Sequence, residues 1–446
     1  MSNIKDLNIF QVVVIVTFLV IGIIGIALFA TGKSGINTSG YKSTIWGVLP
    51  KANIDAGIEP FRIKGQDPTF TYIEFQEEGF EQAILKAIAE GNGPDAIIFP
   101  DYMYYSQINK LLTIPNETVT AEVYKNTYLD IANKFTVQGG IKAFPLLIDP
   151  LVMYYNVDLL KSEGILIPPK DWVEFTNLTE KVVRRQDNGI IDRAYAALGE
   201  YDNVDHAKDI LFAMLSQIGI DLSFYDDGSR AYVSGLVKNK KQLTENEQSA
   251  STLSRQALIF YTEFANPTKS SYTWNKSFSS SREAFLAGDL AIYFGPGSEV
   301  EYLKTRNPNL YFDIAAIPQA YQEKKVTKGK IYSLGFLITS KNANATYQDV
   351  MRFFNTYELN DSLSNSIRLA SARRDVLLNS KAAKTNPDIA VINQSAIFAQ
   401  TWLDPNSNSS DDIFSKMINS IVSGTQNISD AITDASDRLD RLYLTR

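Results

Sequence analysis

An uninterrupted apolar segment stands close to the start of the chain. No charged residue occurs between Asp6 and Lys33, and fourteen of the nineteen residues from Val12 to Ala30 are Val, Ile, Leu or Phe. Nineteen helical residues at about 1.5 Å each span the apolar core of a bilayer. Residues 7–32 therefore predict one transmembrane anchor. A cleaved signal peptide is the alternative, but its apolar part is usually only about 7–15 residues long and Ala30-Thr31-Gly32 is a poor cleavage site.

Residues 33–41 are rich in Gly, Ser and Thr, which is typical of a flexible linker between an anchor and a folded domain. Few residues precede the apolar segment, so the substantial domain follows it, and we expect that domain outside the cytoplasm. Lys5 and Lys33 flank the segment on both sides, so the distribution of positive charge barely discriminates between the two orientations.

Strand and helix patterns alternate after the linker. Ser43–Leu49 and Thr69–Phe75 are β-branched and aromatic runs that predict strands, while the segment between them is short for a helix and carries Pro60. Apolar residues at helical spacing run from Phe80 to a stop at Gly91, and Ala96–Phe99 is a continuous apolar strand. Strand, helix and buried strand in succession indicate a βαβ unit and a mainly parallel sheet.

The remaining pattern continues the alternation of strands and helices. Further predicted strands are Leu151–Asn156, Leu290–Phe294, Tyr311–Ile317 and Leu334–Ile338. Further predicted helices open at Asp171, fill most of Ile190–Gln217, run from Tyr347 to about Leu359, and begin again at Asp411. The Lys-rich stretch Tyr225–Ser251 predicts a solvated insertion.

Composition removes several classes of function. The 446 residues carry 43 Lys+Arg against 50 Asp+Glu, a formal net charge of −7, without the basic clusters that nucleic-acid binding needs. The chain has no Cys, which excludes disulfides, thiolate nucleophiles and Cys-ligated metals. The one histidine, His206, argues against a Ser-His-Asp triad and a multi-His metal site. We therefore expect no catalytic residue, no metal site and no cofactor.

Several segments, taken in order, carry a resemblance to a known family. They are FEQAILKAIAEGNGPDAIIFP (80–100), AFPLLIDPLVMYYNVDLLKSEGI (143–165), PPKDWVEF (168–175), FLAGDLAIYFGPGSE (285–299), NPNLYFDIAAIPQ (307–319) and LITSKNANATYQDVMRFF (337–354). Residues 41–446 resemble the extracellular solute-binding proteins of ABC importers, in particular the sugar-binding, maltose-binding-protein-like family 1.

The resemblance implies an α/β, two-lobe, periplasmic-binding-protein-like (type II) fold with hinge-crossing strands, which binds its ligand in the interlobe cleft and closes around it. The implied first lobe holds residues 41–146 plus 320–358, and the second holds 147–316 plus 362–446. The implied hinge crossings lie near Pro145–Asp149, Ile317–Gln319 and Leu359–Asp361.

Sugar recognition needs carboxylates or amides around the ring edge and aromatic faces above or below it. Asp149 is the first candidate, because the family motif places a ligand-contacting acid at this crossing; a cap on local backbone is the alternative role. Asp101, Tyr102 and Tyr104 follow a strand end, where open α/β sheets bind ligands, although an ordinary surface loop has the same pattern.

Two loop tryptophans, Trp274 and Trp402, are candidate stacking platforms, and simple packing is the alternative for both. Gly297, Ser298 and Glu299 match a family loop that commonly faces the cleft. Maltose-binding protein carries a Trp where this chain has Gly297. That difference puts maltodextrin specificity in doubt and predicts room for a bulkier ligand.

These observations predict a membrane-anchored receptor that binds a mono- or oligosaccharide and delivers it to ABC permease subunits. A glycosidase is a rival, but no pair of carboxylates is singled out. A second rival keeps the fold and binds a polyamine, a peptide or another amino-bearing solute. A third is a sensory ectodomain without transport, which the sequence does not distinguish from the first.

Overall fold

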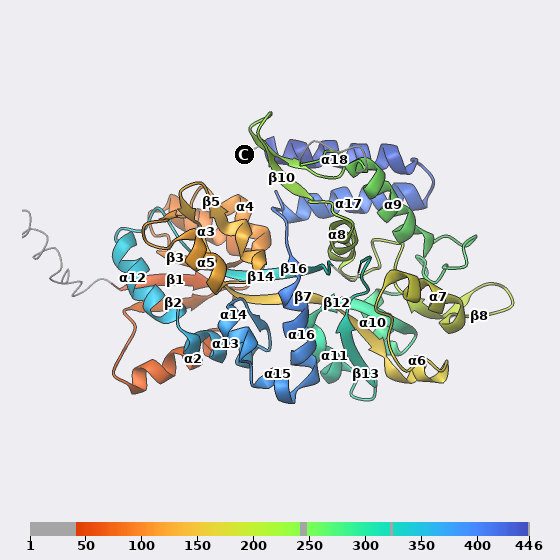
Figure 1. The fold of residues 1–446 in the computed structure, drawn as a ribbon, viewed down its shortest axis with the longest axis horizontal. Helices are drawn as coiled ribbons and strands as arrows, with labels where there is room; N and C mark the ends of the chain where they lie inside the picture. The colour runs from red at the N-terminus through yellow and green to blue at the C-terminus, as the bar shows by residue number, and fades with distance from the viewer. Residues whose placement is uncertain (1–41, 241–247, 322–323, 445–446) are drawn as a thin grey trace, which may run out of the picture. The chain divides into compact units, whose positions relative to one another are not determined.

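The computed structural model describes residues 42–240, 248–321 and 324–444 (Figure 1). The predicted anchor 7–32 and linker 33–41 lie outside these residues. Within the three described ranges, no helix is both long and apolar enough to cross a bilayer. Residues Thr44–Arg446 form one compact unit, and the architecture below is that of this unit.

Eleven strands form one mixed sheet in the described part of the chain. They are β1 (Ser43–Gly47), β2 (Phe70–Glu74), β3 (Ala96–Pro100), β7 (Phe144–Asn156), β8 (Arg184–Arg185), β9 (Ile191–Ala196), β12 (Leu290–Pro296), β13 (Phe312–Ala316), β14 (Thr327–Phe336), β15 (Ala370–Ser371) and β16 (Ala399–Gln400). Small separate sheets are made by β4 (Ile114–Pro115), β5 (Thr136–Val137) and β6 (Gly140–Ile141), and by β10 (Ser223–Asp226) with β11 (Ala231–Ser234).

Strand β7 joins the two ends of the large sheet (Figure 1). Its first half, Phe144–Pro150, pairs with β14 and β15, and its second half, Leu151–Asn156, pairs with β12 and β13. All but one of its thirteen residues are buried. A continuous apolar run with almost no alternation is what a strand covered on both faces requires. The predicted strand Leu151–Asn156 is therefore only the second half of a longer one.

The predicted βαβ unit is confirmed, because β1 and β3 pair in parallel. The prediction of a mainly parallel sheet is wrong. The long pairings of β7 with β14, β12 and β13, and that of β14 with β3, are all antiparallel. Local succession of elements along the chain does not reveal strands that return from far away in sequence.

Helices cover the sheet. The longer ones are α2 (Lys51–Ile63), α3 (Phe80–Ala89), α7 (Trp172–Val182), α8 (Ala207–Gln217), α9 (Ala250–Glu263), α12 (Ala343–Phe354), α13 (Tyr357–Ile367), α16 (Pro387–Ile397), α17 (Ser407–Val422) and α18 (Ile428–Leu444). The shorter ones are α4 (Tyr104–Gln107), α5 (Ala121–Thr127), α6 (Val157–Ser162), α10 (Ser281–Ala287), α11 (Val300–Arg306), α14 (Arg374–Leu378) and α15 (Ala382–Thr385), with 3-10 turns η2 (Asp101–Met103), η3 (Asp130–Phe135) and η4 (Gly297–Glu299).

Helix α2 occupies the segment that looked too short for a helix. Ile54, Ile58 and Phe61 recur at helical spacing and are buried, whereas Pro60 lies on the exposed face. Packing of the apolar face outweighs the hydrogen bond that a proline inside a helix removes. At Asp171, in contrast, the predicted helix start is confirmed, since its carboxylate accepts a hydrogen bond from the Glu174 amide at 2.8 Å.

Three other predicted elements differ from the structure. Ile190–Gln217 contains strand β9 before helix α8, and the helix predicted from Tyr347 to Leu359 is two helices, α12 and α13. The supposedly solvated stretch Tyr225–Ser251 contributes the β10–β11 hairpin, which packs on α18, and the first residues of α9. Burial against a distant helix is not visible in the local sequence.

Leu359–Asp361, expected at a crossing between lobes, lies inside α13. This helix packs on α2, and the following α14 packs on α5. Both partners, α2 and α5, belong to the expected first lobe, and the lobe boundaries stay a prediction. Helices α17 and α18 pack on each other and on α9 (Figure 1).

Because β7 is shared by both halves of the sheet, we expect its central residues to dominate stability. Ile148 has no exposed surface, and its Ala variant removes packing on both flanking strands. Ile148→Ala should cost about 2–5 kcal/mol of unfolding free energy. The matched control is Ile63→Ala, 80% exposed, which should stay within about 0.5 kcal/mol. Chemical denaturation of both variants tests this, and equal effects would contradict it.

Candidate functional site

A cavity of about 280 Å³ opens where the halves of the large sheet meet. Its floor comes from the middle of β7, from η2 directly after β3, and from alternate residues of β14. Its other walls are the start of α8, η4 and the segment before α17. The lining residues are Asp101, Tyr102, Asp149, Leu151, His206, Lys208, Asp209, Pro296, Ser298, Lys328, Lys330, Tyr332, Trp402, Asp404 and Ser407.

Asp149 lies at the centre of β7 and is 4% exposed. Its Oδ1 accepts a hydrogen bond from the Ser298 backbone amide at 3.0 Å. Burial raises the pKa of Asp149, and the Ser298 hydrogen bonds and the nearby Lys330 charge oppose that rise. The carboxylate therefore ties β7 to η4 and still lines the cavity, so the capping role and ligand contact are compatible.

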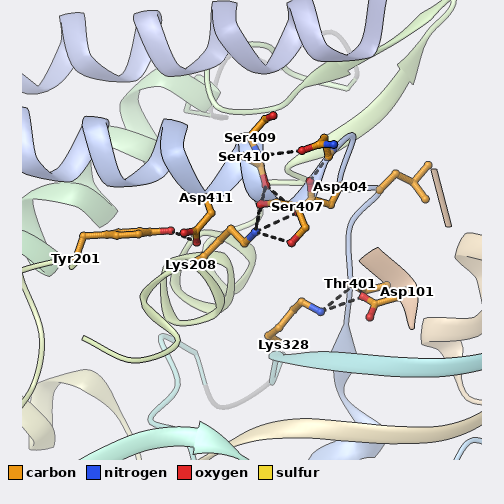
Figure 2. Close-up of polar contacts among 12 residues, drawn as sticks. Asp101, Tyr201, Lys208, Lys328, Thr401, Asp404, Ser407, Ser409, Ser410 and Asp411 are labelled. Carbon is orange, nitrogen blue, oxygen red and sulfur yellow. Dashed lines mark hydrogen bonds and ion pairs between the residues drawn. The ribbon is translucent and has the colours of Figure 1, made fainter. Parts of the chain in front are cut away.

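Asp101 directly follows β3 and is held by residues of the neighbouring strand β14 and by Thr401, which follows β16 (Figure 2). Its Oδ2 accepts hydrogen bonds from Lys328 Nζ at 3.1 Å and from the Thr401 hydroxyl, and its Oδ1 accepts one from the Ile331 amide at 3.1 Å. Most of the acceptor positions of the Asp101 carboxylate and the donor positions of the Lys328 ammonium are therefore already used in hydrogen bonds. The Lys328 ammonium is thus fixed in place beside the cavity.

Lys330 repeats this arrangement two residues further along β14. Its Nζ donates to both carboxylate oxygens of Glu77, at 2.7 and 3.0 Å, and Tyr102 donates to Glu77 Oε1 at 2.7 Å. The ammonium also lies over the rings of Tyr102 and Tyr332, 5.7 and 5.2 Å from the centroids. Burial lowers the pKa of Lys330, but Tyr332 and Glu77 raise it by more, so the amine stays charged.

Lys208, in the first turn of α8, is the third cavity lysine (Figure 2). Its Nζ donates to Asp404 Oδ2 at 3.3 Å, to the Ser407 carbonyl at 2.9 Å, and to the hydroxyls of Ser407 and Ser410 at 3.2 and 3.1 Å. Burial raises the pKa of Asp404, and the Lys208 charge opposes the rise. This network fixes the start of α17 against the start of α8.

Aromatic side chains from three segments line the same cavity, namely Tyr102, Tyr332 and Trp402. Trp402 is 3% exposed and packs edge-on against Phe414, with ring centroids 6.3 Å apart. Its indole Nε1 makes no hydrogen bond within the described residues. The ring is therefore mostly packed and offers a ligand little surface.

Glu299, a sequence candidate, lies behind the cavity wall rather than on it. Its Oε1 accepts from Arg282 at 2.6 Å and lies 3.1 Å from His206 Nε2, and its Oε2 accepts from Tyr293 at 2.6 Å. Burial raises the pKa of Glu299, but these partners lower it by more. His206, which does line the cavity, stands between Glu299 and the space a ligand can fill.

Two other candidates are not brought to the cavity. Trp274 has no exposed surface, stacks on Phe278 at 4.3 Å between centroids, and donates its Nε1 to Asn203. Tyr104 is 1% exposed and packs edge-on against Phe135. Each ring is buried in the core. Packing is the alternative expected for Trp274, whereas the surface loop expected as the alternative for Tyr104 does not describe this buried ring.

The expectation that Gly297 leaves room for a bulkier ligand is wrong. A Cβ built on it would lie 2.8 Å from Ile392 Cγ1, so α16 already fills the space beside it. The missing side chain therefore leaves no extra room for a ligand. Ser298, by contrast, lines the cavity.

Sequence reasoning missed the three lysines, His206, Asp404 and Tyr332. A period-two signal was available for β14, because Lys328, Lys330 and Tyr332 alternate with the buried residues Gly329 and Ile331. Lys208 and Asp404 are far apart in sequence, and no local pattern joins them.

A larger hollow, about 680 Å³, lies between the end of α9 and the α17–α18 turn. Arg255 is its one charged lining residue, and none of the carboxylates, lysines or aromatic rings described above reaches it. The smaller cavity is therefore the better candidate site.

Replacing the buried carboxylate at the centre of this site should stabilise the ligand-free protein. The pKa of Asp149 is raised in the folded state, so its ionised form costs stability at neutral pH, and that cost disappears as the pH falls below the folded pKa. Asp149→Asn keeps an acceptor for the Ser298 amide. We expect a higher melting temperature at pH 7 and a gain that shrinks in acid, measured by thermal unfolding across pH.

The control is Asp412→Asn, an exposed carboxylate, which should change the melting temperature little at any pH. A lower melting temperature for Asp149→Asn at pH 7 would contradict the argument.

Solved structures similar to this chain are sugar-binding proteins of the same two-lobe α/β fold. A cyclic α-maltosyl-1,6-maltose binding protein from Arthrobacter globiformis aligns over 91% of this chain and 100% of its own, with 14% identity and a TM-score of 0.72. A cyclo/maltodextrin-binding protein complexed with maltotetraose aligns over 90% and 96%, with 14% identity and a TM-score of 0.69. An ABC substrate-binding protein from Listeria monocytogenes, in complex with cycloalternan, aligns over 90% and 98%, with 13% identity and a TM-score of 0.65.

A protein of Deinococcus radiodurans described as a probable ABC transporter-binding protein is 32% identical over 82 residues, which is 18% of this chain and 20% of that protein. The aligned part thus spans a fifth of that curated relative. The family model for bacterial extracellular solute-binding proteins matches residues 56–391, about three quarters of the sequence. The chain belongs to the bacterial extracellular solute-binding proteins.

Proposed function

We propose that the protein binds an uncharged carbohydrate in the cavity between the halves of its sheet and delivers it to an ABC-type permease. The family consists of extracellular binding proteins, which supports an extracytoplasmic domain that binds without turnover. Binding in the cavity, closure around the ligand and release to the permease then make up the whole activity.

The observation that carries the proposal is the pairing of charges around the cavity. Each of its three lysines already donates to a carboxylate: Lys208 to Asp404, Lys328 to Asp101 and Lys330 to Glu77. An ionic ligand has to break or outcompete such pairs. A sugar hydroxyl both donates and accepts, so it can bond to the remaining capacity of fixed carboxylates and ammonium groups without adding charge.

The ligands named for the similar structures support the same class. They are cyclic α-maltosyl-1,6-maltose, maltotetraose and cycloalternan, and a further similar protein from Thermotoga lettingae is bound to α-D-tagatose. The first three are oligosaccharides and the fourth is a single sugar. At 13–16% identity these similarities do not indicate which of the four sugars this protein binds. Saccharides of several sizes are therefore included in the binding test.

One observation favours the second candidate, an amino-bearing solute. Asp209 lines the cavity and makes no hydrogen bond within the described residues. It also lines an adjoining outer hollow of about 590 Å³, together with Asp202, Asp411 and Asp412. A ligand with an ammonium group at that end would gain charge attraction there.

Anchoring through residues 7–32 belongs to the same proposal. An apolar N-terminal helix holds the receptor near its permease, as a lipid attached to Cys does in other proteins, and this chain has no Cys. A sensory ectodomain remains the alternative to a transport receptor; growth of the host on the bound sugar after deletion of the gene distinguishes the two.

The first test is thermal unfolding against mono- and oligosaccharides, polyamines and peptides. A ligand at 100 times its dissociation constant adds about 2.7 kcal/mol to the native state, which gives a readily measured rise in melting temperature. We expect saccharides alone to produce it and to be recovered unaltered. If only polyamines or peptides raise the melting temperature, the ligand is an amino-bearing solute and not a sugar. Cleavage of a saccharide would overturn the binding-only mechanism.

Asp149→Asn should weaken saccharide binding while stabilising the free protein. Loss of a charge-assisted hydrogen bond costs about 1.5–3 kcal/mol, or roughly a 10- to 150-fold rise in Kd. Isothermal titration calorimetry measures the effect, with Asp187→Asn, an exposed carboxylate that lines neither hollow, as the control. An unchanged Kd for Asp149→Asn would remove this carboxylate from the binding site.

A further inference from the structure

His206 has an unusual backbone for a helix start. It immediately precedes α8 with φ 62° and ψ 23°, in the left-handed region, and its side chain caps none of the helix amides. It is one of three described residues other than glycine with positive φ. Such a conformation persists where the surroundings hold it, and it is enriched at ligand sites. Capping, the usual role at this position, does not explain the residue.

The surroundings hold the ring through one nitrogen. His206 Nε2 lies 3.1 Å from Glu299 Oε1, and the ring packs against Tyr293 with centroids 6.4 Å apart. Glu299 is itself fixed by Arg282 and Tyr293. Arg282 Nη2 also lies 3.2 Å from His206 Nε2. Arg282 only donates and the Glu299 carboxylate only accepts, so a protonated Nε2 bonds to Glu299 and an unprotonated Nε2 accepts from Arg282. The closer contact and the negative charge of Glu299 favour the proton on Nε2. Nδ1 is then the ring atom without a hydrogen-bond partner within the described residues.

His206 also stands at the junction of two spaces. It lines both the 280 Å³ cavity and the 590 Å³ outer hollow, as do Lys208, Asp209 and Ser407. The starts of α8 and α17 therefore form a shared rim. A ligand too long for the inner cavity has to pass His206 to reach the outer one.

We propose that His206 is a ligand-contacting specificity residue, that its Nδ1 bonds to a hydroxyl of a saccharide spanning both spaces, and that Glu299 is its positioning residue. This inference rests on the proposed function and adds a length requirement and a named atom to it. Glu299, a direct ligand contact in the sequence interpretation, acts here through the imidazole.

The charge state of the ring sets what Nδ1 can do. Burial lowers the pKa of His206, but the hydrogen bond and charge of Glu299 raise it by more; Asp209 on α8 raises it further and Arg282 on α10 lowers it. Tyr293 on β12 contacts the same cluster. The imidazolium donates from Nδ1 and the neutral ring accepts there, and a hydroxyl satisfies both. An ammonium group only donates, so it cannot bond to Nδ1 of the imidazolium, and the two positive charges repel each other. The protonated ring therefore selects against cationic ligands.

The chain has one histidine, so ¹⁵N-histidine labelling reports on His206 alone without assignment. In the full-length purified protein we expect the neutral ring to carry its proton on Nε2, and a pKa that falls in Glu299→Gln. Saturation with maltotetraose should shift the Nδ1 resonance more than that of Nε2. A proton on Nδ1 in the free protein, a pKa unchanged in Glu299→Gln, or a bound saccharide that leaves Nδ1 unshifted would each overturn the inference.

Affinity measurements separate recognition from simple support of the fold. Asparagine adopts the left-handed backbone readily, but its side chain does not extend to the position of the His206 Nδ1 atom. His206→Asn should therefore raise the Kd for maltotetraose at least tenfold and the Kd for a monosaccharide much less. Glu163→Gln is the matched control: it removes a Glu held by two arginines, Arg184 and Arg193, away from both spaces. It should leave Kd and the ¹⁵N spectrum unchanged.

The outcomes also separate this inference from the proposed function. If a monosaccharide binds but longer saccharides do not, the proposed function stands and the length requirement is wrong. Equal loss of affinity for short and long saccharides in His206→Asn would likewise overturn the junction role. If no saccharide binds at all, the proposed function and this inference both fail.

Discussion

The shared strand β7 is the constraint from which the rest of the structure follows. Its thirteen residues take different partners in each half, so the two sets of surrounding strands and helices meet on one continuous backbone. A strand paired on both sides cannot slip by one residue without moving every side chain to the opposite face. Asp149 lies where the partners change. Its position is therefore set by both halves of the sheet, and a ligand that bonds to it senses how those halves are arranged.

Charges inside a cavity are tolerated only when something compensates them. Removing an ammonium or a carboxylate from water costs several kcal/mol, and a well-placed partner repays that cost. Here each cavity lysine has a carboxylate partner, while Asp149 has a backbone amide and a more distant lysine. The pairs hold donors and acceptors in fixed directions before a ligand arrives. Binding then loses less conformational entropy than it would with mobile side chains, which is the benefit of preorganisation.

How much the sequence reveals depends on the range of the interactions. Local patterns located β1, β3 and the cap of α7, because alternation, apolar runs and capping are properties of neighbouring residues. They missed α2, whose helical face is stabilised by burial, and the antiparallel partners of β7, which come from distant segments. Resemblance to a family led to Asp149 and Ser298, and the position after a strand end led to Asp101 and Tyr102. The structure brings all four to one cavity.

The misplaced site residues have the same explanation. Trp274 and Tyr104 are loop or strand-end aromatics whose packing partners determine their direction, and Gly297 has Ile392 beside it, from a helix about ninety residues later. The missed lysines were hidden because an exposed and a buried lysine look alike in sequence until the carboxylate partner is known. Only β14, with Lys328 and Lys330 on one face, carried a readable signal.

The start of α8 shows how fold and recognition are linked. Lys208 there fixes the start of α17 through Asp404 and Ser407, and His206, two residues earlier, is fixed by Glu299 from η4, the same turn whose Ser298 amide holds Asp149. A movement of η4 therefore acts on the carboxylate in the floor and on the imidazole in the rim together. Because one short turn positions both groups, a ligand that contacts either one stabilises the geometry of the other, and affinity depends on the whole arrangement rather than on separate contacts.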